Sequence, residues 1–158
     1  MRNRLTYTLT AVAVAALVAA AVAVAAGSSS APQITQPATL HVIEHPVTDT
    51  VVNTGAPGDT TGDLLTFHNK LFNATNTKVV GRDQGSCIRI SPARGSWECM
   101  WTNFLPGGHI TVEGPFFDSH DSIVTVTGGT GVYRNVRGQM LLHARPNGQF
   151  NFVFSLIP

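Results

Sequence analysis

The chain has 158 residues, with ten Lys and Arg against nine Asp and Glu and a formal charge of +1. That length suits one domain. The basic side chains are scattered along the sequence, whereas a nucleic-acid-binding protein gathers them in a patch or stripe, so we expect no nucleic-acid partner.

The first 26 residues have the pattern of a secretory signal peptide. A basic start at Met1–Arg4 is followed by an apolar run from Ala11 to Ala26 and then by small residues. This order is typical of signal peptides, and the run is shorter than the roughly 20 apolar residues of a membrane helix. We predict a signal peptide over 1–26, secretion, and no membrane contact after cleavage; a membrane anchor is the alternative.

After the signal peptide, the sequence predicts a short leader and one β domain. Residues 27–38 are rich in Ser, Pro and Gln and are expected to form a flexible leader. The remainder, 39–158, consists of β-rich runs separated by Gly, Pro, Asn and Asp, without helical periodicity. Strands are predicted at 39–46, 62–69, 77–90, 96–104, 108–114, 121–127, 132–145 and 149–156.

The longest predicted connection, 47–61, contains a short extended piece at Val51–Val52. The other connections are short turns, and eight antiparallel strands joined in this way indicate an all-β barrel or sandwich. An eight-stranded antiparallel β-barrel has room inside for one small ligand or for a filled core.

Cys87 and Cys99 are the two cysteines of the chain, and a Pro-Ala-Arg-Gly turn lies between them. If that turn centres on residue 93, Cys87 faces Cys99 on the neighbouring strand. Directly opposed residues lie about 4.5–5.5 Å apart, which a disulfide spans. An even cysteine count in an exported chain also favours a disulfide. We therefore predict a Cys87–Cys99 disulfide, with a working thiol as the alternative.

The same register pairs Arg89 with Trp97, Ile90 with Ser96 and Gly85 with Trp101. Because side chains alternate along a strand, Arg89, Trp97 and Trp101 share the face of the cysteines. On the inner face of a barrel they either line a pocket or, for the two indoles, fill the core.

Several motifs, taken in order, resemble the allene oxide cyclase and dirigent group of barrels. GDLLTFHNKLFNATNTKVVGRDQGSCIRI (62–90) and GGHITVEGPFFDSHDSIVTVTGGTGVY (107–133) are similar to cyclase segments, while GRDQG (81–85) and GGTGVYRNVRG (128–138) are similar to dirigent motifs. The resemblance implies an eight-stranded barrel with a pocket at one mouth, assembly into homotrimers, and neither a metal nor an organic cofactor. Its cyclases convert a fatty-acid allene oxide into a cyclopentenone, and its dirigents steer the coupling of phenoxy radicals.

The resemblance also implies site residues. Asn69 matches a pocket asparagine, Cys87 a pocket cysteine, and Arg137 a functional arginine of the dirigents. Gapless matching puts Val42 where the cyclases have their key glutamate and Glu44 two residues later. Residues 42 and 44 share a strand face about 6–7 Å apart, so a carboxylate is expected on the same wall but displaced.

The candidate site therefore has three catalytic residues, Glu44, Asn69 and Arg137. The predicted ligand-binding residues are Val42, Arg89, Trp97, Trp101 and Tyr133, the last because it shares the face of Arg137 on the strand expected at 132–145. The alternatives are a solvated rim carboxylate for Glu44 and a solvated outer position for Arg137. No metal site is expected, since His41 and His45 on one strand lie about 13 Å apart.

The sequence favours a secreted cyclase-like or isomerase-like enzyme that positions a small hydrophobic, reactive substrate in the barrel. A non-catalytic or dirigent-like protein that binds a small hydrophobic or phenolic molecule is the alternative, and a barrel with a solid interior is a third hypothesis.

Overall fold

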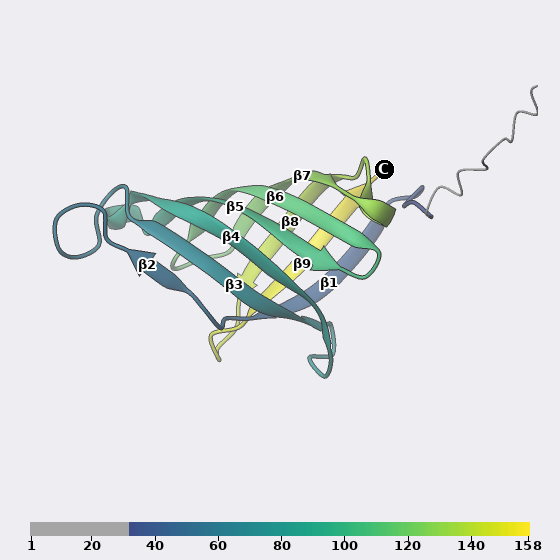
Figure 1. The fold of residues 1–158 in the computed structure, drawn as a ribbon, viewed down its shortest axis with the longest axis horizontal. Coiled ribbons are helices and arrows are strands. Elements are labelled where there is room, and N and C mark those ends of the chain that lie inside the picture. The colour runs from purple at the N-terminus through teal and green to yellow at the C-terminus, as the bar shows by residue number, and fades with distance from the viewer. Residues whose placement is uncertain (1–31) are drawn as a thin grey trace, which may run out of the picture.

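The computed structural model describes residues 32–158, which form a closed eight-stranded antiparallel β-barrel (Figure 1). The strands are β1 (Ala38–His45), β3 (Leu64–Asn73), β4 (Val79–Ser91), β5 (Ser96–Leu105), β6 (Gly108–Phe117), β7 (Ser122–Gly129), β8 (Arg137–Ala144) and β9 (Phe150–Ile157). A short additional strand, β2 (Thr50–Val52), pairs with the start of β3. The predicted barrel is thus confirmed, whereas the signal peptide lies outside the described residues.

The barrel closes through β1, which pairs with β9 on one side and with the second half of β3 on the other. The remaining strands follow one another in chain order from β3 to β9. Each joins its neighbour by a short turn, which is the connectivity that antiparallel strands allow. Within residues 32–158 no helix is long and apolar enough to cross a membrane.

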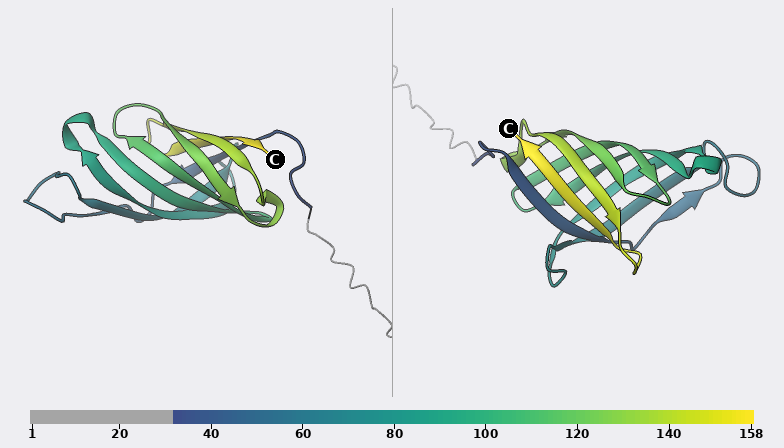
Figure 2. Two further views of the ribbon diagram at one scale, coloured as in Figure 1. Left: turned by 90° about the horizontal axis from the view of Figure 1, so that it is seen from above. Right: turned by 180° about the vertical axis from the view of Figure 1, so that it is seen from behind.

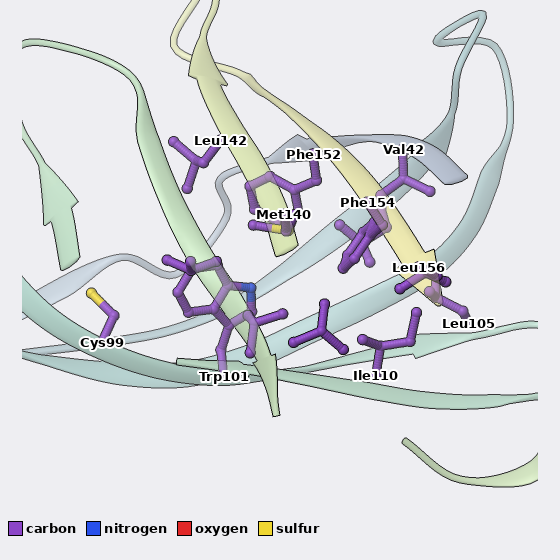
Figure 3. Packing of buried hydrophobic residues seen from close by; sticks show 14 of the residues in the cluster. Val42, Cys99, Trp101, Leu105, Ile110, Met140, Leu142, Phe152, Phe154 and Leu156 are labelled. Carbon is purple, nitrogen blue, oxygen red and sulfur yellow. The ribbon is translucent and has the colours of Figure 1, made fainter. Parts of the chain in front are cut away.

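Alternating side chains build the core. On β9, Phe152, Phe154 and Leu156 point inward and are almost fully buried, while Ser155 is exposed. Figure 3 shows that Met140 of β8 and Trp101 of β5 reach the same interior. The period of two seen in the sequence therefore places one apolar row from each strand inside the barrel.

The stretch expected to open the strand at 132–145 is not a strand. A single 3-10 turn, η2 (Gly131–Tyr133), occupies it, and Asn135 follows with φ of +67°. Gly131 also has positive φ, and a Cβ there would collide with the carbonyl oxygen of Gly107. The chain bends sharply at this rim, so β8 begins only at Arg137.

The two ends of the barrel differ (Figures 1 and 2). At one end, Ile34 of the predicted leader donates its N–H to the carbonyl oxygen of Val132, and the Arg134 side chain donates a hydrogen bond to the side-chain oxygen of Gln33. At the opposite end lies the loop 53–62. Toward the end that holds the leader the interior is packed with side chains such as Leu105, Ile110 and Leu156, while the cavity described below lies toward the loop end.

Candidate functional site

A cavity of about 70 Å³ lies inside the barrel toward the loop end. Its polar lining consists of Glu44, Asp49 and Asn69. The apolar lining consists of Leu65, Phe67, Cys87, Cys99, Trp101, Phe116, Leu142, Phe150 and Phe152. The structure thus contains a small apolar space with one polar wall, so the hypothesis of a solid interior is wrong.

Alternation along β1 and β3 places the polar wall. Glu44 shares the inward face with Val42 and is 5% exposed, and Asn69 of β3 is 2% exposed. The Asn69 amide donates one N–H to Glu44 Oε1 at 2.8 Å. The structure therefore brings together two of the three residues predicted as catalytic, and Glu44 is not a solvated rim carboxylate.

Protein groups occupy all the hydrogen-bonding positions of the Asn69 side chain. Its amide nitrogen donates to Glu44 and, at 2.8 Å, to Asp49 Oδ1. Its oxygen accepts the backbone N–H groups of Val47 and Thr48 at 2.6 and 3.2 Å. A side-chain amide has two donors and two acceptor positions, so Asn69 holds Glu44 and the segment after β1 in place and has no free group for a ligand.

A second buried carboxyl group lies behind Glu44. Asp83 of β4 is fully buried, accepts the N–H of Asn69 at 3.2 Å, and lies close enough to Glu44 for a proton on one carboxyl group to bond to the other. Burial raises the pKa of Glu44 well above its usual value, and the charge of Asp83 raises it further. Burial likewise raises the pKa of Asp83 to about 7. Two adjacent carboxylates cannot both ionise in a poorly solvated site, so the pair shares a proton near neutral pH.

The polar layer extends from Asp83 across to β5. Three buried side-chain atoms have no protein partner within residues 32–158: Asp83 Oδ2, Asn103 Oδ1 and Trp101 Nε1. Asp83 and Asn103 are directly opposed, and Trp101 is the next inward residue on β5. A proton on Asp83 supplies a donor to a layer with an excess of acceptors, which favours its neutral form.

The predicted disulfide between Cys87 and Cys99 is present, and both residues line the cavity. They are opposed residues of β4 and β5, as are Arg89 and Trp97. The expected Ile90–Ser96 pair is wrong because a bulge after Arg89 pairs Ser91 with Ser96 instead. Neither cysteine is free, so the hypothesis of a working thiol does not fit the structure.

Of the predicted ligand-binding residues, Trp101 lines the cavity and Arg89 does not. The Arg89 guanidinium lies over the Trp97 ring at 4.0 Å and donates hydrogen bonds to the carboxylates of Asp59 and Asp118. Trp97 also donates its indole N–H to Asp118 at 2.9 Å. These contacts fasten the loop 53–62 to the barrel, so Arg89 and Trp97 have structural partners outside the cavity.

Val42 and Tyr133 belong to the packed core. Val42 is 2% exposed and does not line the cavity. Tyr133 lies in the rim turn η2, where its hydroxyl donates to the carbonyl oxygen of Pro106 at 3.2 Å. Neither residue lines the cavity: Val42 packs in the core beside it, and Tyr133 lies in the rim turn whose Val132 contacts the leader.

Arg137 is exposed on the outer face of β8 and donates to the carbonyl oxygen of Pro158 at 2.8 Å. Met140 and Leu142 occupy the inward positions of β8, which leaves odd-numbered residues such as Arg137 outside. The expected shared face with Tyr133 is absent because η2 interrupts the strand. The structure thus gives Arg137 no contact with the cavity.

Asp49 and Asp83 were not among the site residues predicted from the sequence. Asp83 lies four residues before Cys87 on the same strand, so period two predicts the same inward face. Asp49 lies in the connection between β1 and β2, where no periodicity places it. No three His, Cys, Asp or Glu side chains within residues 32–158 are arranged to hold a metal ion.

Comparison with known proteins gives a family and a fold. The family model described as allene oxide cyclase matches residues 41–154. A pyocyanin demethylase superposes with a TM-score of 0.68 and 24% identity, covering 76% of this chain and all of the other. A pterocarpan synthase dirigent protein superposes with a TM-score of 0.62 and 17% identity, covering 77% and 83%. A Diels–Alderase from Streptomyces koyangensis has a TM-score of 0.59 and 15% identity, covering 79% and 70%.

Proposed function

Because this chain belongs to the allene oxide cyclase family, we propose that it is a cyclase-like or isomerase-like enzyme for a small, mostly apolar substrate. The observation that carries the proposal is the buried Glu44 carboxyl at the wall of an apolar cavity. Its raised pKa keeps it available as a neutral acid. A neutral carboxylic acid donates a hydrogen bond or a proton, which is the role of a general acid.

The proposed mechanism is chiefly positioning. The aromatic and aliphatic lining holds the substrate in one folded conformation, which lowers the entropic part of the barrier. Glu44 donates its proton to a substrate oxygen as bonds rearrange, and the proton returns to Glu44 in a later step, so the product is an isomer. Asn69 fixes the orientation of the Glu44 carboxyl, and Asp83 holds the shared proton next to it.

An isomer search in the small-molecule extract of the native host tests the proposal. The purified protein is incubated with the extract, and mass spectrometry follows compounds that change retention time at constant mass. We expect at least one such conversion, lost in Glu44→Gln and kept in Glu98→Gln, whose side chain is exposed on the outer face of β5. No conversion, or one that survives Glu44→Gln, would refute the proposal.

The dirigent-like alternative is favoured by the aromatic lining of the cavity, which suits a phenolic ring. In that case the extract yields a compound that binds and is released unchanged. We further propose that the protein is secreted and forms a homotrimer. Native mass spectrometry of protein purified from the culture medium tests both, since it reads the assembly mass and any bound molecule in one spectrum.

A further inference from the structure

We propose that the cavity selects ligands with a positive charge on a compact apolar or aromatic body. This adds a substrate class to the proposed function and rests on the same cavity. The first observation is the balance of charge around that space. Glu44 and Asp49 line it and Asp83 lies directly behind Glu44, whereas no Lys, Arg or His is among its lining residues.

Arg89, buried at the loop end of the barrel, does not change this balance. Its Nε and Nη2 donate hydrogen bonds to the Asp59 carboxylate at 2.7 and 2.8 Å, and its Nη1 donates one to the Asp118 carboxylate at 2.6 Å. Two carboxylates thus surround one guanidinium, which leaves no net positive charge to attract an anion. The field in the cavity is therefore set by its own carboxyl groups.

The second observation is the aromatic lining. Five rings border the cavity: Phe67, Trp101, Phe116, Phe150 and Phe152. The Trp101 ring lies 6.2 Å from that of Phe67 and 6.1 Å from that of Phe152, and the pairs are inclined rather than parallel. Inclined rings around a common space present faces as well as edges to a guest, and aromatic faces attract organic cations.

The two observations act in the same direction. A cation is attracted by the carboxylate of Asp49, by the Glu44–Asp83 pair once that pair has lost a proton, and by the ring faces, while its apolar body is desolvated by the same walls. An anion faces carboxyl groups without a counter-ion, and burying an unpaired charge is costly. Near a protein surface, two opposite charges about 4 Å apart attract each other several-fold more strongly than in bulk water. The sign of the ligand's charge therefore decides whether the ligand binds.

Binding of a cation also depends on pH. The charged group that faces the Glu44–Asp83 pair is Asp49, after β1, while β3 and β5 contribute the neutral amides of Asn69 and Asn103. A cation favours the ionised form of the pair. The affinity therefore rises as the pH increases through the pKa of Asp83, about 7, and levels off above it.

Three probes of similar shape test the proposal by calorimetry: benzyltrimethylammonium, its neutral carbon isostere neopentylbenzene, and phenylacetate. At pH 8 we expect the cation to bind at least about tenfold more tightly than the neutral isostere, and phenylacetate to bind least. Asp49→Asn should weaken the binding of the cation and leave the binding of neopentylbenzene unchanged. Glu113→Gln, which removes an exposed carboxylate from the outer face of β6, is the matched control.

Equal or tighter binding of neopentylbenzene or phenylacetate, or no binding of any probe, would overturn the proposal. Equal losses in Asp49→Asn and Glu113→Gln would also overturn it, because the attraction would then be a general surface effect. The assay needs no turnover, so it separates this inference from the proposed function. Isomerisation of an anionic compound would support the enzyme and contradict the cation preference.

Discussion

Replacing Asp83 by Asn tests the buried acid pair through stability. The pKa of Asp83 is raised from 3.8 to about 7 in the folded barrel. Between those two values the folded state holds a proton that the unfolded state releases, so the unfolding free energy falls as the pH rises. At 1.36 kcal/mol per pKa unit, a rise of about three units corresponds to a loss of about 4 kcal/mol between pH 4 and 8.

The Asp83→Asn variant lacks this titration. Its unfolding free energy relative to the natural chain should therefore increase by about 4 kcal/mol from pH 4 to pH 8, with most of the change below pH 7. Urea denaturation at each pH measures the free energy of unfolding of both proteins. In the difference between the two values, the contributions of groups that titrate alike in both proteins cancel. A difference that stays constant with pH would refute the shared proton of Glu44 and Asp83.

Three further predictions concern other parts of the barrel. Replacing both Cys87 and Cys99 by Ala should lower the free energy of unfolding by about 3 kcal/mol, which is the loop entropy of a link between residues 12 apart. Reduction of the natural chain with dithiothreitol should lower its stability to the same value. An unchanged urea midpoint would contradict this. Arg89→Met should lower the free energy of unfolding by only about 1–2 kcal/mol, because its partners Asp59 and Asp118 are 49% and 41% exposed and solvent weakens the ion pairs. The same substitution should speed proteolysis of the loop 53–62, whereas Arg94→Met, at an exposed position, should not. Trp101→Phe should abolish fluorescence quenching by a bound cavity ligand, while Trp97→Phe should retain it, since only Trp101 of the two lines the cavity; quenching that follows Trp97 would place the ligand elsewhere.

The barrel could be predicted because its evidence is local. Alternating side chains and turn residues reveal each strand, and the turn between the cysteines fixes the register that pairs Cys87 with Cys99. Alternation put Glu44 on the strand face of Val42, and the family resemblance put Asn69 in the pocket; of the two positions left open for Glu44, the structure shows the buried one. The hydrogen bond between Glu44 and Asn69 is a pairing of distant strands, for which the family resemblance supplied the only guide.

The failures have physical causes. Period two assigns a face but not a depth, so Arg89 and Trp97 face inward as expected yet lie beyond the cavity. For Arg137 the assumed strand was too long, because η2 and the left-handed Asn135 interrupt it. The burial of Asp83 is unexpected because a carboxylate is rarely buried unpaired, and here a shared proton makes the burial tolerable.

A pH titration of the side-chain carboxyl carbons by ¹³C NMR in the ligand-free protein tests the buried acid pair most directly. We expect Asp83 to titrate near pH 7 and Glu44 to titrate well above an exposed glutamate, and we expect each carboxyl carbon to sense the titration of the other. Titration of both groups near pH 4, as in water, would mean that the apolar cavity has no neutral acid at its wall.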